Sequence, residues 1–127
     1  MFEGLSAYRP QALAALRIMT ALLFIEHGTQ KFFNFPAAEQ PFGDLMNLIG
    51  VAGALEIAGG VLILLGLFTR PAAFVLCGFM ALAYFMAHAP QNFFPVNNRG
   101  DAAILFCFVF LYLTAAGPGA FALDNRR

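Results

Sequence analysis

Four long apolar runs constrain the fold of this 127-residue chain more than any other feature of its sequence. They cover about residues 11–33, 45–68, 71–89 and 100–116. As helices, most of them are long enough to cross a hydrocarbon core about 30 Å thick. A helix of a soluble protein carries a polar face opposite its apolar stripe, and these runs have almost none. The sequence therefore predicts an all-α, integral membrane four-helix bundle, with residues 1–127 as one domain.

The composition agrees with a membrane protein. Apolar residues make up 61% of the chain and charged residues 11%, whereas soluble domains average about 45–50% and about 25%. Seven basic and seven acidic residues cancel, so no basic patch is expected and nucleic acid is excluded as a partner. Arg17 interrupts the first apolar run, which is therefore predicted to be a retained span and not a cleaved leader.

The distribution of Lys and Arg predicts that both termini of this multi-pass chain are cytoplasmic. The segments on the side of the termini hold Arg9, Arg70, Arg126 and Arg127, against Lys31 and Arg99 on the other side. With this orientation the ionisable groups of the spans gather in the outer half of the bundle, except for Arg17.

Glu56 is the sharpest single signal, because it lies near the middle of the second run without a charged neighbour. An unpaired carboxylate there would cost about 2.5–3.5 kcal/mol. It must be protonated, or paired with Arg17, Lys31 or a histidine of another helix. Small residues surround it and let a helix or a flat ligand approach; they are Ala52, Gly53, Gly59 and Gly60. The alternative role for Glu56 is a buried ion pair that only holds helices together.

The end of the first run carries several ionisable groups. At 100° per residue, Arg17, His27 and Lys31 share one helix face, which is predicted to point into the bundle. Gly28 lies on that side and favours a close helix contact. Glu26 lies on the opposite face and is predicted to reach the surface or a neighbouring subunit. For Lys31 and Arg17, snorkelling to the membrane surface is the alternative.

Tyr84 and His88 share a face of the third run. Together with a glutamate they can pass protons or hydrogen-bond a quinone carbonyl, although a lone histidine is more often a satisfied core group. No two histidines share a helix at metal spacing, so no metal site is expected. Asn98 is predicted to cap the last helix, with Asp101 reaching back as in a capping box, while Asp101 borders the outer polar groups.

The two cysteines give no motif. Cys77 and Cys107 lie in different apolar runs, and no CxxC pair exists. Disulfide-framework and metal-site interpretations gain no support from this spacing. Both cysteines are predicted to act as small hydrophobic residues.

Taken in order, these features resemble the DoxX family of small bacterial and archaeal membrane proteins. The matching pieces are Arg17, HGTQK at 27–31, EIAGG at 56–60, Gly66, TRPAA at 69–73, NRGDA at 98–102, GPG at 117–119, and Leu123 with Asp124. The family usually has Asn-Gly-Gly-Glu before its last helix, and here Arg99 and Asp101 replace the second and fourth residues. The resemblance implies a four-helix inner-membrane bundle linked to quinone-dependent oxidation of reduced sulfur compounds, or to complexes that handle redox stress.

The favoured hypothesis is a quinone-interacting subunit of a redox system. Its catalytic residues would be Glu56 and His27, and a flat gap beside Gly59 and Gly60 would admit the quinone ring. The ligand-binding residues would be Lys31, Arg17, Tyr84, His88 and Asp101. No haem, flavin or cysteine-pair motif is present, so electrons are expected from a redox partner protein.

Two other functions stay open. One is a non-catalytic partner or assembly subunit of a larger complex, in which the polar groups only hold the bundle together. The other is a small-solute or proton pathway. Four helices leave little lumen, so the pathway would require a homo-oligomer.

Overall fold

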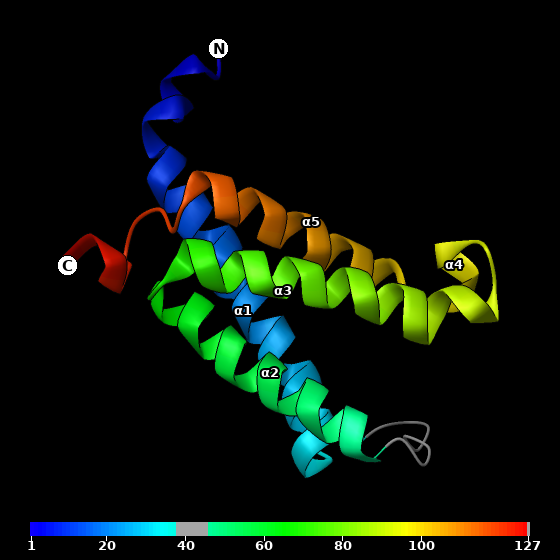
Figure 1. Cartoon of the computed structure of the whole chain (residues 1–127). Coiled ribbons are helices and arrows are strands. Elements are labelled where there is room, and N and C mark those ends of the chain that lie inside the picture. Colours follow the sequence, from blue (N-terminus) through cyan, green and yellow to red (C-terminus); the bar gives the residue numbers. More distant parts are fainter. Residues whose placement is uncertain (38–45, 127) are drawn as a thin grey trace.

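The computed structural model describes residues 1–37 and 46–126, with the side chains of residues 46–48 left out of the description. All regular elements in these ranges are helical (Figure 1), which confirms the predicted all-α class. The long helices are α1 (Arg9–Phe33), α2 (Met46–Leu65), α3 (Thr69–Ala83) and α5 (Asp101–Ala116). The short elements are η1 (Glu3–Tyr8), η2 (Tyr84–His88), η3 (Ala89–Gln91), α4 (Pro95–Asn98) and η4 (Leu123–Arg126).

The long helices form two pairs. Helix α1 packs along α2, and α3 packs along α5, with fewer contacts between the pairs. The pairs lie close together near the C-terminal segment and diverge toward the end that holds α4 (Figure 1). Phe24 joins them in the core, since its ring meets those of Phe106 and Phe110 edge-on at centroid distances of 5.3 and 5.0 Å.

Glycines bring α1 and α2 into backbone contact. A Cβ placed on Gly28 would lie 2.9 Å from the Gly53 carbonyl oxygen, so only glycine permits this approach. Gly59 and Gly60 also face neighbours: a Cβ on Gly59 would meet Leu76 at 2.7 Å, and one on Gly60 would meet Ile25 at 2.5 Å. The predicted flat gap beside these two glycines is therefore wrong, because side chains of α3 and α1 fill it.

The start of α5 differs from the predicted capping box. Asn98 Oδ1 accepts a hydrogen bond from the Gly100 backbone N–H at 2.8 Å, and no side chain caps the helix that begins at Asp101. The Asn98 side chain thus closes a local turn just before the helix starts. The capping prediction for Asn98 and Asp101 is wrong, and Asp101 lies exposed on the first turn.

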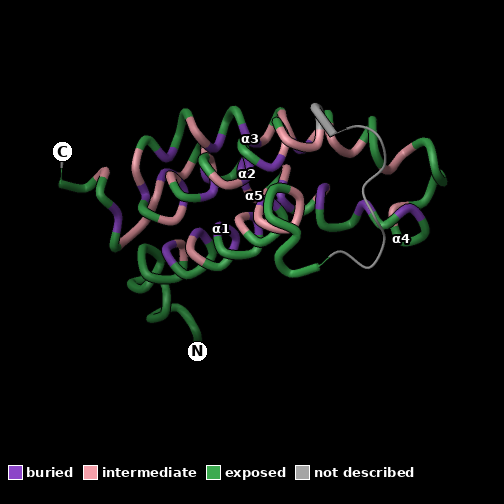
Figure 2. The backbone as a smooth tube through the Cα atoms, turned by 90° about the horizontal axis from the view of Figure 1, so that it is seen from below, coloured by how far each residue is buried: buried purple, intermediate pink, exposed green. Residues whose placement is uncertain are grey.

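Large apolar side chains cover the outside of the helices. Figure 2 shows buried residues on the faces that the helices turn toward one another and exposed residues on the outer faces. Phe74, Leu82, Leu105 and Phe108 are each more than half exposed. Among the described residues, two stretches are long and apolar enough to cross a membrane, Glu3–Phe33 and Thr69–Gln91. Two shorter apolar helices, Ile49–Leu65 and Asp101–Ala116, accompany them.

Candidate functional site

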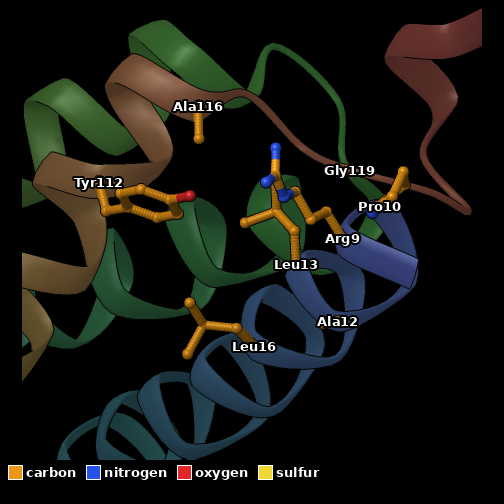
Figure 3. Close-up of a pocket in the computed structure, with 8 residues that line it drawn as sticks. All are labelled: Arg9, Pro10, Ala12, Leu13, Leu16, Tyr112, Ala116 and Gly119. Atoms are coloured by element: carbon orange, nitrogen blue, oxygen red, sulfur yellow. The ribbon is translucent and has the colours of Figure 1, made fainter. Parts of the chain in front are cut away.

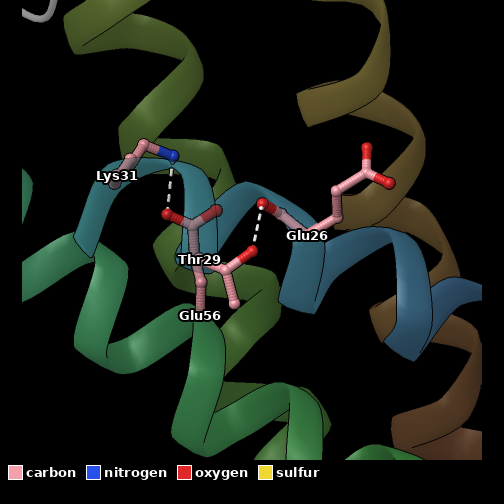
Figure 4. A network of polar contacts seen from close by, with 4 residues as sticks. All are labelled: Glu26, Thr29, Lys31 and Glu56. Atoms are coloured by element: carbon pink, nitrogen blue, oxygen red, sulfur yellow. Dashed lines mark hydrogen bonds and ion pairs between the residues drawn. The ribbon is translucent and has the colours of Figure 1, made fainter. Parts of the chain in front are cut away.

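The buried carboxylate of Glu56 pairs with Lys31. Lys31 Nζ donates to Glu56 Oε1 at 2.6 Å, and the two side chains point toward each other from α1 and α2 (Figure 4). Glu56 is 2% exposed, whereas the Lys31 side chain is 24% exposed. Of the three partners that the sequence left open, the structure selects lysine. The close approach of α1 to α2 at Gly28 makes this pairing possible.

His27 lies one helical turn before Lys31 on α1 but contacts α5 instead of Glu56, and it is exposed, so the prediction that it points into the bundle is wrong. Its ring meets the Phe106 ring of α5 edge-on at a centroid distance of 5.7 Å, and it is exposed without a hydrogen bond within residues 1–37 and 46–126. It remains within electrostatic range of Lys31 and His88. His27 therefore borders the ion pair but does not touch Glu56, and its ring nitrogens are open to a ligand.

Glu26 points away from the ion pair. Figure 4 shows its carboxylate directed away from Lys31 and Glu56. The residue is exposed, and only its backbone carbonyl joins the local network, by accepting the Thr29 hydroxyl at 3.0 Å. This position agrees with the helical-face prediction, and it makes Glu26 a suitable control for Glu56.

Tyr84, His88 and Asn98 form a second polar cluster beyond the end of α3. His88 Nδ1 lies 3.0 Å from the Asn98 carbonyl oxygen, and Asn98 Nδ2 donates to the Tyr84 hydroxyl at 3.1 Å. The Tyr84 and His88 rings stack at 6.3 Å. The segment Tyr84–His88 is a π-helix turn, a form frequent at functional sites. No hydrogen bond among the described residues joins this cluster to Glu56, so the predicted Tyr–His–Glu set is divided.

Arg17 belongs to neither cluster. It is fully buried and lies 14 residues before Lys31, or about 21 Å along α1. Its guanidinium donates to the backbone carbonyls of Pro118, Ala120 at 3.0 Å and Phe121 at 2.9 Å. Arg17 points inward, as predicted, but it binds the C-terminal segment of its own chain.

Asp124 completes the attachment of that segment, a role that sequence reasoning missed. Its carboxylate accepts the backbone N–H groups of Phe68 at 2.8 Å and Thr69 at 2.9 Å, at the start of α3. An acidic group at a helix N-terminus satisfies free donors and complements the helix dipole. Residues 117–126 are thus held by Arg17 from α1 and by the turn between α2 and α3. The available signal was the family-like Leu-Asp ending, to which no role was assigned.

A groove of about 550 Å³ lies at the Arg17 end of α1, between that helix and α5 (Figure 3). Arg9, Leu13 and Leu16 line it from α1, and Tyr112 lines it from α5. None of the predicted site residues is among its lining residues. The groove and the ion pair are therefore separate features of the molecule.

Cys77 and Cys107 meet across the seam between α3 and α5. Their Sγ atoms lie 3.7 Å apart, and both thiols are free and half-buried. The prediction of two unrelated small hydrophobic residues missed this contact, because 30 residues separate the two cysteines. No short-range motif signals such a pair.

The chain is similar to curated proteins along nearly its whole length. A Haemophilus influenzae protein described as uncharacterized is 49% identical over 98% of this chain and 96% of its own. The Escherichia coli "Inner membrane protein YphA" is 30% identical over 94% of this chain and 93% of its own. The Bacillus subtilis "Putative oxidoreductase CatD" is 33% identical over 86% of this chain and 81% of its own.

The remaining comparisons concern solved structures and families. No solved structure matches the chain. The DoxX family model matches residues 12–89, a range that holds most of α1, all of α2 and α3, and the Lys31–Glu56 pair. This match covers more than half of the chain and agrees with the motif order of its sequence. The chain belongs to the DoxX family.

Proposed function

We propose that the chain is a multi-pass protein of the inner membrane, a four-helix bundle with both termini cytoplasmic. The exposed apolar side chains on the outer faces of α1, α2, α3 and α5 support this proposal, because a patch of this extent needs a nonpolar surrounding. Basic residues favour the side of the termini. The similarity to a protein named as an inner membrane protein points the same way.

Within that bundle, we propose that the chain is a quinone-interacting subunit of a thiol- or sulfur-linked redox system. The observation that carries the proposal is the Lys31–Glu56 pair, in which a 2% exposed carboxylate meets a lysine that is still 24% exposed. Ionisable groups inside a membrane protein mark function by default. The similarity to a protein named as an oxidoreductase favours redox chemistry over a purely structural role.

The residues around this pair fit a quinone head group. A lysine ammonium has three donors, and Glu56 takes one of those of Lys31, so others are available to a quinone oxygen. His27 adds a donor beside the Phe106 ring, which offers an aromatic edge to a flat ligand. We place the quinone ring beside Lys31 and His27, since Gly59 and Gly60 are covered by neighbouring side chains.

Each residue then has a defined task. A bound quinone accepts two electrons and two protons to become a quinol. Lys31 stabilises negative charge that develops on a quinone oxygen, Glu56 holds a proton close to that oxygen, and His27 orients the head group. Arg17 has no part in this chemistry, because its guanidinium is occupied by backbone carbonyls.

Quinone retention tests the proposal. The protein is purified in mild detergent, and bound quinone is extracted and quantified for wild type, Glu56→Gln and His27→Ala. We expect near-stoichiometric quinone in wild type and a loss of most of it in both variants. Glu26→Gln, which changes an exposed carboxylate on the same helix, is the matched control and should retain wild-type quinone.

The opposite result has an equally clear meaning. Quinone at the lipid background in all samples, with the helical fold intact, would contradict the proposed site. The Lys31–Glu56 pair would then serve only to join α1 to α2. The chain would be better described as a non-catalytic assembly subunit, and its partner would be sought by stoichiometric co-purification.

A further inference from the structure

The two cysteines of the chain lie close enough to react with each other. Their Sγ atoms are 3.7 Å apart, and a disulfide requires about 2.05 Å. Closing the pair needs a movement of about 1.7 Å, shared between side chains on two helices that already pack along each other. Both cysteines are free in this structure.

The position of the pair selects the kind of reactant that can reach it. Cys77 lies midway along α3 and Cys107 midway along α5, and both are half-buried at the edge of the core. Gly78, the next residue after Cys77, has open space beside it, and Phe108, the next after Cys107, is 62% exposed. In the proposed topology this edge faces hydrocarbon. A lipid-soluble reactant can approach the thiols there, and a water-soluble protein cannot.

The thiol pair is also connected to the Glu56 region through packing. Leu76 precedes Cys77, and its side chain fills the space beside Gly59, which lies three residues after Glu56 on α2. The dithiol and the ion pair therefore lie on helices that touch.

We propose that Cys77 and Cys107 are a redox-active dithiol that closes to a disulfide and reduces a membrane quinone to a quinol. Two S–H bonds break and one S–S bond forms. The two electrons and two protons are transferred to the two oxygens of the quinone, so the reaction balances without another oxidant. The inference rests on the proposed function for its electron acceptor. The dithiol would be an electron donor within the chain itself, whereas the sequence suggested that a partner protein supplies the electrons.

The test uses the full-length protein in lipid nanodiscs. The protein is reduced, the reductant is removed, and excess decylubiquinone is added without oxygen. We expect both thiols to become resistant to alkylation, the chain to lose the mass of two hydrogens, and one quinol to form per chain. Dithiothreitol should restore both thiols. Cys77→Ser and Cys107→Ser should form no quinol, because a single thiol cannot close an intramolecular disulfide.

Two further arms separate this inference from the proposed quinone site. Diamide, a small disulfide-forming oxidant, is applied to the same nanodiscs, and retained quinone is measured in both serine variants. Thiols that stay free with decylubiquinone, whether or not diamide closes them, overturn the redox dithiol. If the thiols do not react, but the protein retains quinone and loses it in Glu56→Gln, the proposed quinone site stands without the redox dithiol. Quinol formation that persists in Glu56→Gln supports the dithiol and contradicts the proposed site.

Discussion

The two ends of α1 use a buried cation in opposite ways. Arg17 is fully enclosed, and its guanidinium is committed to three backbone carbonyls of the C-terminal segment. Lys31 keeps a quarter of its side chain exposed, and within residues 1–37 and 46–126 its partner is the Glu56 carboxylate. Both residues lie on one face of the same helix. The difference indicates that a fully enclosed cation bound by backbone carbonyls holds structure together, whereas a cation with a partly exposed side chain is accessible to a ligand.

The physical basis of this difference is the environment of the carbonyls. Pro118, Ala120 and Phe121 lie in a segment without helical hydrogen bonds of its own. In a nonpolar surrounding, each unpaired carbonyl is costly. Arg17 satisfies three of them at once, while Asp124 satisfies two N–H groups at the start of α3. Lys31 has no comparable task, because Glu56 is the group that it neutralises.

The largest effect is expected at Arg17. Arg17→Leu removes the guanidinium donors to the carbonyls of Pro118, Ala120 and Phe121 and should lower the free energy of unfolding by about 3–5 kcal/mol, the usual cost of breaking a buried charged network. Thermal unfolding in detergent measures the loss, and limited proteolysis should reveal cleavage near residues 117–126. Arg126→Gln, an exposed control, should leave both unchanged. An Arg17→Leu protein with wild-type stability would contradict the role of Arg17 in holding the C-terminal segment.

A smaller and asymmetric effect is expected for the ion pair. Lys31→Met leaves the 2% exposed Glu56 carboxylate unpaired, which should cost about 2.5–3.5 kcal/mol. Glu56→Gln should cost less than about 1 kcal/mol, because Lys31 can extend to the membrane surface. The double variant should recover most of the loss caused by Lys31→Met. Equal costs for the two single variants, measured by chemical unfolding, would contradict this asymmetry.

The last substitution tests the helix contact that positions Lys31. Gly28→Ala places a methyl group 2.8 Å from Ile57 Cγ1 and 2.9 Å from the Gly53 carbonyl oxygen. The resulting overpacking should cost about 1–3 kcal/mol and reduce quinone retention by separating Lys31 from Glu56. Gly78→Ala is the matched control on α3, where the methyl group meets nothing within 4 Å. If both alanine variants behave alike in unfolding and in quinone retention, backbone contact at Gly28 does not set the site.

Local sequence patterns predicted the features that depend on neighbouring residues. The apolar runs predicted the long helices within a few residues, since helix formation depends on nearby composition and breakers such as Pro118. The same periodicity placed His27 and Lys31 near one end and directed Glu26 away. The prediction at Asn98 was wrong because its side chain can bond either the next turn or the helix, and spacing does not distinguish these.

Tertiary contacts decided the rest. Arg17 meets carbonyls more than 100 residues away, and the choice of Lys31 over Arg17 for Glu56 depended on where along α1 helix α2 makes its close contact, which is at Gly28. The gap expected beside Gly59 and Gly60 was filled by Leu76 and Ile25, residues of other helices. The sequence by itself determined the helices, their apolar surfaces and the buried charges. Only the tertiary structure decided that Arg17 is bound by backbone carbonyls, that Lys31 stays partly exposed and that two distant thiols meet. Those outcomes depend on helix packing and not on spacing along one helix.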